Sequence, residues 1–170
     1  MQICDNETRP NQLYTAEQRQ RRDASVWTLV QGVLAPIQFL VFLISLALVL
    51  RFLMTGEGQT EATTSVVTKT IALYTIMVTG CIWEKVVFDC YLFAPAFFWE
   101  DLFSMFVLAL HTAYLVALLT GSLGTQSLMY LALAAYAAYV VNAAQFILKL
   151  RAARLGQAHQ ALNAQQGVAA

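Results

Sequence analysis

Five ionisable side chains lie within one short stretch of an otherwise apolar sequence, and they are the residues best suited to chemistry. They are Glu84, Lys85, Asp89, Glu100 and Asp101. Charged side chains are costly inside a membrane and normally face the interior of a helix bundle, so the cluster predicts a functional site. Carboxyl groups in such a place could donate and accept protons, which is general acid–base chemistry.

His111 adds a further group to this region. At 100° per residue, Glu100, Ser104 and His111 share one helix face, with His111 about 16 Å deeper than Glu100. Its imidazole could activate water, bind a metal, or only form an interhelical hydrogen bond. The acids have structural alternatives too, because acids at a helix N-terminus favour the macrodipole. Lys85 and Asp89, at i and i+4, can neutralise each other.

Two stripes of polar side chains are predicted to face the interior of the same bundle, one with seven-residue and one with three-residue spacing. The first comprises Gln31, Gln38 and Ser45, and the second Tyr139, Asn142 and Gln145. For any single residue, interhelical hydrogen bonding is the simpler role. Together with the many aromatic residues, they could instead line a pocket for a flat apolar ligand.

The composition indicates which environment holds these groups. Of the 170 residues 59% are hydrophobic and 12% charged, whereas an average soluble domain has about 45–50% apolar and 25% charged residues. The formal net charge of zero gives no basic excess, which argues against nucleic acid as a partner. The three cysteines lack metal-ligand spacing, and no intrinsic metal site is expected.

The apolar residues are gathered in runs of bilayer length, which predicts membrane-spanning helices. No cleavable signal peptide is expected, because the first residues are polar and charged. The sequence predicts an all-α integral membrane protein, built as a four-transmembrane-helix bundle. Its predicted parts are a polar tail at 1–23, a membrane domain at 24–150 with spans at about 24–50, 68–93, 97–119 and 128–149, and a second tail at 151–170.

Lysine and arginine residues set the expected orientation. Most of them lie in the two tails, and only Arg51 and Lys69 are expected to border the first loop. Both termini are therefore predicted to be cytoplasmic. An even number of spans then places the turn between the second and third spans, with its acidic cluster, on the cytoplasmic side as well.

Long segments of the sequence resemble one known family. These segments are LYTAEQRQRRD at 13–23, WTLVQGVLAP at 27–36, WEK at 83–85, YLFAPAFFWED at 91–101 and ALHTAY at 109–114. They resemble the 3-vinyl bacteriochlorophyllide hydratases of bacteriochlorophyll synthesis, called 2-vinyl hydratases in the older ring numbering. The resemblance covers most of the chain, and the last span and the tail match less distinctly.

The resemblance implies that water is added across the C3-vinyl group of chlorophyllide a or a bacteriochlorophyllide precursor, giving the 3-(1-hydroxyethyl) compound. No cofactor is expected, because the Mg belongs to the pigment. A protonated carboxyl group, Glu84 first and Glu100 or Asp101 next, would protonate the terminal vinyl carbon. Water activated by a carboxylate or by His111 would attack the resulting cation. Alternatively, His111 would be an axial ligand of the pigment Mg.

The same resemblance implies a chlorophyllide or bacteriochlorophyllide pigment as ligand, membrane lipid as surroundings and neighbouring pigment-biosynthesis enzymes as further partners. It implies a bacterial inner or intracytoplasmic membrane as the location. The residues expected to contact the pigment are Trp83, Trp99, Gln31, Gln38, Tyr114 and Asn142.

Two other classes of function use the same residues. A non-catalytic subunit could bind pigment or support assembly of a photosynthetic complex without any chemistry. A small proton-coupled carrier could use Glu84, Lys85 and His111 as a relay. The sequence has no internal repeat of the kind that carriers usually show, which makes the carrier the weaker alternative.

Overall fold

The computed structural model describes the backbone of residues 13–168 and the side chains of residues 13–155. Within this range all regular structure is helical, which confirms the predicted all-α class. The helices are α1 (Ala16–Ala24), α2 (Val26–Thr55), α3 (Gln59–Phe88), α4 (Phe98–Thr120) and α5 (Thr125–Val168).

Four of these helices are long and apolar enough to cross a membrane, as the sequence predicted. The spanning segments are Val26–Thr55, Gln59–Phe88, Phe98–Thr120 and Thr125–Leu155. One boundary differs in a way that matters, because α3 begins at Gln59 and not near residue 68. The expectation that Lys69 borders the first loop is therefore wrong: it lies well inside α3, and its side chain is fully buried.

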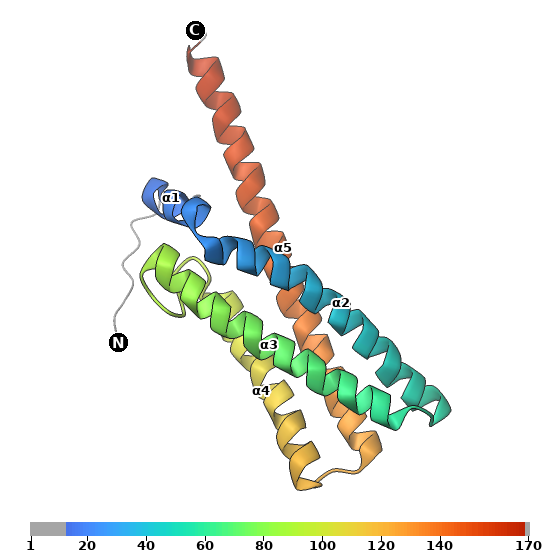
Figure 1. Ribbon diagram of the computed structural model, residues 1–170. Coiled ribbons are helices and arrows are strands. Elements are labelled where there is room, and N and C mark those ends of the chain that lie inside the picture. The colour runs from blue at the N-terminus through green and yellow to red at the C-terminus, as the bar shows by residue number, and fades with distance from the viewer. Residues whose placement is uncertain (1–12, 169–170) are drawn as a thin grey trace.

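The spanning helices form two hairpins (Figure 1). α2 packs mainly against α3, and α4 mainly against α5, while contacts between the hairpins are sparser. Each hairpin turns at a glycine in the left-handed region, Gly56 with φ 75° and Gly121 with φ 63°. A residue without a Cβ adopts this conformation without strain, so a short turn can reverse the chain at both places.

Polar bonds reinforce the first hairpin along its length. The Gln31 amide donates to Thr79 Oγ1 at 2.7 Å, and the Trp83 indole N–H donates to Thr28 Oγ1 at 2.9 Å. These bonds join side chains far apart in the sequence and fix the register between α2 and α3. Gln31, a predicted pigment contact, is thereby engaged in helix packing.

Two apolar clusters stabilise opposite ends of the bundle. The larger one, around Phe42, Val66, Met129 and Tyr136, lies toward the hairpin turns. The smaller one lies at the α3–α4 connection and comprises Tyr14, Val87, Phe88, Ala94 and Phe97. The chemistry-bearing residues lie beside the second cluster or between the two.

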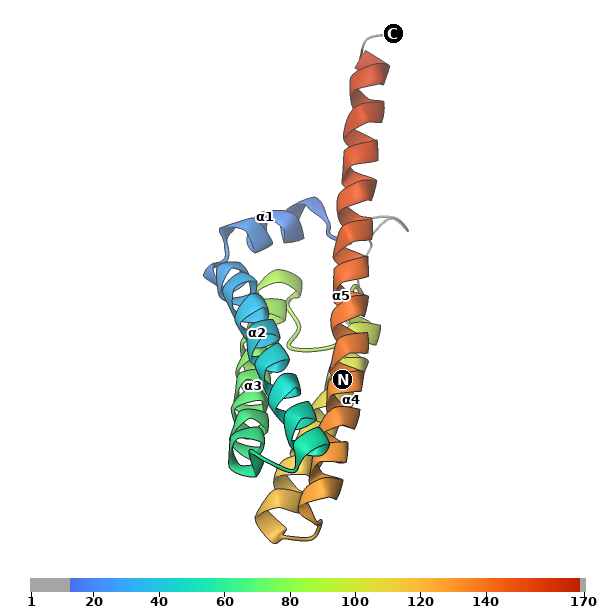
Figure 2. The same cartoon turned by 90° about the vertical axis from the view of Figure 1, so that its right-hand side faces the viewer.

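α1 lies crosswise to the long helices at the end of the bundle that also holds the α3–α4 connection, and α5 extends beyond the bundle at this end (Figures 1 and 2). Thr15 caps α1 through a capping box with Gln18. Tyr14, just before α1, is buried in the smaller apolar cluster, and burial raises the pKa of its hydroxyl. α1 thus closes this end of the bundle.

Candidate functional site

The connection between α3 and α4 brings the acidic residues of the two helices together. α3 ends where Asp89 adopts the left-handed region at φ 64°, and Phe93 in the same connection has φ 60°. Non-glycine residues seldom adopt these angles and carry a conformational cost of about 1 kcal/mol or more, so the surrounding contacts must hold them there. Such strained residues are often found at functional sites.

Glu84 on α3 and Asp101 on α4 form a buried carboxyl pair at this connection. The two carboxyl groups interact with each other, and the residues are only 6% and 4% exposed. Two ionised carboxylates repel each other at close range in a buried site, so a proton on one of them stabilises the pair. The Glu84–Asp101 pair therefore holds an acid and a base side by side.

Backbone amides of the connection fix both carboxyl groups. Phe93 N–H donates to Asp101 Oδ2 at 2.9 Å, and Ala94 N–H donates to Glu84 Oε2 at 3.4 Å. The shorter bond favours the negative charge on Asp101, because a hydrogen bond to a charged acceptor is short and strong. This arrangement leaves the shared proton on Glu84.

Aromatic rings cluster at the same α3–α4 connection as the buried carboxyl pair. Trp83 meets Phe88 and Phe97 edge to face, with centroids 5.7 and 5.8 Å apart. Tyr14 stacks on Phe88 at 5.6 Å, and Phe146 of α5 stacks on Phe97 at 6.0 Å. The buried environment strengthens electrostatic interactions within the pair.

Glu100 lies next to Asp101 in sequence, but its carboxylate has a different partner. Lys149 Nζ on α5 donates to Glu100 Oε2 at 2.6 Å, forming an ion pair that is mostly buried. The paired carboxylate is poorly suited to donate a proton. Helical spacing could not predict this pair, because the two residues are far apart along the chain and lie on different helices.

The Lys85–Asp89 pair expected from their i, i+4 spacing is confirmed. Lys85 Nζ lies 2.8 Å from Asp89 Oδ1, and both side chains are exposed. The hydrogen bond from Lys85 holds the pKa of Asp89 below its usual range. Asp89 is therefore an ionised surface group and does not belong to the buried pair.

His111 shares a buried face of α4 with Glu100 and Ser104, as their spacing predicted. Its Nδ1 lies 2.9 Å from the Val107 carbonyl oxygen. Because a carbonyl oxygen only accepts, Nδ1 must carry the proton, and a neutral imidazole then presents a lone pair at Nε2. Ten residues separate Asp101 from His111, about 15 Å along the helix, so His111 does not meet the carboxyl pair.

The residues expected to contact pigment are dispersed. Trp83 belongs to the aromatic surroundings of the carboxyl pair, whereas Trp99 is 67% exposed on the outer surface. Tyr114 is fully buried deeper in the bundle, with its hydroxyl facing Thr63. Asn142 donates to Ser104 Oγ at 2.8 Å.

Both polar stripes face the interior of the bundle. Ser45 of the first stripe has its hydroxyl 2.7 Å from that of Ser65 on α3 and 2.6 Å from that of Tyr136 on α5. It thereby links the two hairpins. Gln38 precedes Ser45 by seven residues in the same stripe. It is 3% exposed, and its amide nitrogen has no partner among the described residues.

Lys69, which the sequence places wrongly at the edge of the first loop, is a buried ionisable group. It has no exposed surface, and its Nζ has no hydrogen-bond partner within the described part of the chain. A signal was present, because Ala62, Val66 and Leu73 precede and follow it at helical spacing and are also buried. The threonine-rich start of α3 obscured this stripe by resembling a loop.

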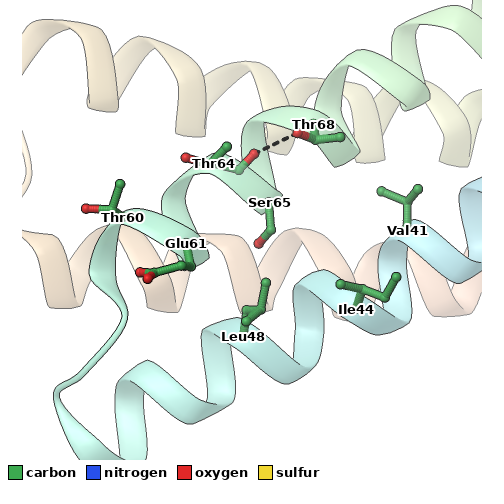
Figure 3. A pocket seen from close by; sticks show the side chains of 8 residues that line it. All are labelled: Val41, Ile44, Leu48, Thr60, Glu61, Thr64, Ser65 and Thr68. Carbon is green, nitrogen blue, oxygen red and sulfur yellow. Dashed lines mark hydrogen bonds between the residues drawn. The ribbon is translucent and has the colours of Figure 1, made fainter.

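An open groove of about 490 Å³ lies elsewhere, between α2 and α3 near their turn (Figure 3). Ile44 and Leu48 line it from α2, and Glu61 and Thr64 from α3. Glu61 and Glu84 are 23 residues apart, about 34 Å along α3, so the groove is not part of the carboxyl site. Among the described residues, no group of three or more His, Cys, Asp or Glu side chains could hold a metal ion.

Comparison with known proteins identifies the family to which this sequence belongs. A sequence model of the 2-vinyl bacteriochlorophyllide hydratase family matches residues 14–152. The chain belongs to the 2-vinyl bacteriochlorophyllide hydratase family. The match includes Tyr14, both residues of the buried carboxyl pair and Lys149, so the hydratase family match spans the whole of this site.

Two curated hydratases are close relatives. The 2-vinyl bacteriochlorophyllide hydratase of Rhodobacter capsulatus is 66% identical over 148 residues, covering 87% of this chain and 86% of the relative. That of Cereibacter sphaeroides is 70% identical over 144 residues, covering 84% and 89%. No solved structure matches this chain. The family resemblance noted in the sequence is thus confirmed.

Proposed function

We propose that this chain is a hydratase that adds water to the C3-vinyl group of chlorophyllide a or a bacteriochlorophyllide precursor, giving the 3-(1-hydroxyethyl) product. Family membership and the names of the two relatives support the reaction class. The observation that carries the mechanism is the buried Glu84–Asp101 carboxyl pair.

The pair can perform both proton transfers of a hydration. Glu84 donates its proton to the terminal vinyl carbon, where the π electrons form the new C–H bond. The positive charge develops on the inner carbon, is delocalised into the macrocycle and is stabilised by the Asp101 carboxylate. Water then forms the new C–O bond and returns a proton to the carboxyl pair. The reaction consumes one alkene and one water without oxidation or reduction, so no cofactor is required.

His111 suits binding better than proton transfer in this scheme. The Val107 carbonyl holds the ring as the tautomer with a lone pair on Nε2, and Nε2 has no partner among the described residues. A neutral imidazole with a buried, available lone pair is a suitable axial ligand for the Mg of the pigment. His111 lies about 15 Å from Asp101 along α4, so it does not activate water at the carboxyl pair, and a macrocycle bound to it would be centred deeper in the bundle than that pair.

The proposed function also implies where the carboxyl site lies relative to the membrane. A pigment in a membrane can approach the aromatic surroundings of the carboxyl pair, to which Trp83 contributes. The arginines of α1 and the cations at the end of α5 favour cytoplasmic termini, so the carboxyl site faces the cytoplasmic side of a bacterial inner or intracytoplasmic membrane. Membrane lipid surrounds the helices, and enzymes that make or use the pigment are expected neighbours.

The test is conversion of chlorophyllide a by membranes that contain the chain, with product detected as a mass gain of one water. Glu84→Gln should reduce turnover by about 100-fold or more, because general acids contribute on the order of 10² to 10⁴ in rate. Lys85→Gln is the matched control, since Lys85 is adjacent but exposed, and it should retain activity. Full activity of Glu84→Gln would refute the acid assignment. Pigment binding without conversion by the unaltered chain would favour a non-catalytic subunit.

A further inference from the structure

Each of the four spanning helices contributes a buried polar side chain with an atom that has no hydrogen-bond partner in the described part of the chain. The four atoms are Gln38 Nε2, Lys69 Nζ, His111 Nε2 and Asn142 Oδ1. Their residues are between 0% and 9% exposed. Buried polar groups are almost always paired, and bundle proteins bind ligands in their cores through side chains from facing helices. Four unpaired atoms on four helices therefore indicate a ligand site.

The contacts of Lys69, His111 and Asn142 place them within about two turns of α5, between the two hairpins. Lys69 Nζ lies 3.7 Å from the ring centroid of Tyr139, which is one helical turn from Asn142 on α5. The His111 ring lies 5.9 Å from that of Tyr136, one turn further along the same helix. The four helices thus converge on a common interior region.

Gln38 reaches this region from α2. Phe42, one turn along α2, has its ring centroid 5.0 Å from that of Tyr139, the residue that lies against Lys69. Gln38 and Lys69 therefore approach the same part of α5 from two different helices. Both present N–H donors, the groups that recognise an anion.

Lys69 lacks an anion of its own. None of the ion pairs among the described residues includes it, and the face of Tyr139 compensates a buried ammonium only in part. An unpaired charge in a membrane interior is costly and normally marks a binding or transport role. A carboxylate ligand would supply the missing charge.

We propose that Lys69, assisted by the Gln38 amide, binds the carboxylate side chain of the pigment substrate. This inference rests on the proposed function, because a chlorophyllide is the free-acid form of the pigment and carries a propionate on a different ring from the vinyl group. Lys69 lies 15 residues before Glu84, about 22 Å along α3. Both residues are buried, so the carboxylate of the pigment would be held deeper in the bundle than the carboxyl pair.

Binding at Lys69 also defines how the pigment enters. Lys69 has no exposed surface, and packing is dense within each hairpin but sparser between them. The pigment therefore reaches Lys69 by parting the hairpins along their common face. The carboxylate contact then sets which edge of the macrocycle meets Glu84, so Lys69 is a positioning and specificity residue.

The experiment compares binding of chlorophyllide a with that of its methyl ester, which removes only the negative charge. Affinities for the full chain in detergent are read from pigment fluorescence. The unaltered chain should bind the acid about tenfold or more tightly than the ester, because hydrogen bonds to a charged group contribute roughly 1.5–3 kcal/mol. Lys69→Gln should bind both pigments equally, at the affinity of the unaltered chain for the ester.

Arg51→Gln is the matched control, since Arg51 is an exposed cation on α2, and it should keep the preference for the acid. Lys69→Gln removes an unpaired buried charge, so its thermal stability in detergent should not fall. A full preference for the acid in Lys69→Gln, or no preference in the unaltered chain, would overturn the inference. If the unaltered chain binds chlorophyllide a more tightly than the methyl ester but hydrates neither pigment, the proposed function is refuted and the inferred binding site is retained.

Discussion

Replacing Lys149 with methionine should destabilise the bundle by about 2 kcal/mol. Lys149 Nζ lies 2.6 Å from Glu100 Oε2, and the two side chains are 26% and 10% exposed. Breaking a fully buried ion pair costs about 3–5 kcal/mol, whereas an exposed pair contributes about 0–1 kcal/mol. The partial exposure of Lys149 places the expected loss between these limits. Methionine keeps an apolar side chain of similar length, so the loss reports the ammonium group, including its position 5.1 Å from the Phe97 ring centroid.

The free energy of unfolding of the purified chain, measured by denaturant titration in detergent, tests this value. Lys85→Met is the control, because its pair with Asp89 is exposed, and it should cost less than about 1 kcal/mol. Adding Glu100→Gln to Lys149→Met should recover most of the lost stability, since a neutral amide does not need the cation.

The same variants separate a structural role of Glu100 from a catalytic one. Glu100→Gln alone should retain most of the turnover of chlorophyllide a, because the carboxylate is held by Lys149 and not by the carboxyl pair. A folded Glu100→Gln protein that loses turnover 100-fold would refute this reasoning and make Glu100 the acid.

Two further pairs of substitutions test a contact within the first hairpin and the glycines of the turns. Thr28→Val removes the acceptor of the Trp83 indole N–H and should cost about 1–2 kcal/mol of unfolding free energy. Trp83→Phe should then cost less in the Thr28→Val protein than in the unaltered chain, because the bond is already lost. Equal costs of Trp83→Phe in the two proteins would contradict this. Gly56→Ala should cost about 1 kcal/mol because φ is 75°, whereas Gly124→Ala, with open space and no positive φ, should leave the melting temperature nearly unchanged.

Much of the fold could be predicted from the sequence because bilayer thickness imposes a length on each apolar run. The turn near Gly121 and the α4 boundaries follow from this rule, as does the local Lys85–Asp89 pair from helical spacing. The start of α3 could not be found in the same way. Its first turns are rich in threonine and carry Glu61, so the helix extends beyond the apolar run that indicated it.

The candidate site was harder to predict because it depends on tertiary contacts. Glu100 and Asp101 are adjacent and equally acidic, but they project from different sides of α4 and meet different helices. Asp101 meets Glu84 because the connection turns sharply at Phe93, and Glu100 meets a lysine of α5. No spacing rule within one helix distinguishes these outcomes. Lys69 was missed for a related reason, since its burial depends on the opposite hairpin.

The division of the carboxyl pair between hairpins has a consequence for how the protein matures in the membrane. Glu84 is synthesised with the first hairpin, and Asp101 with the second, so neither half alone contains the acid–base pair. A newly inserted first hairpin carries Glu84 without its partner Asp101. The proposed chemistry requires the second hairpin to dock against the first, so activity would report that assembly is complete.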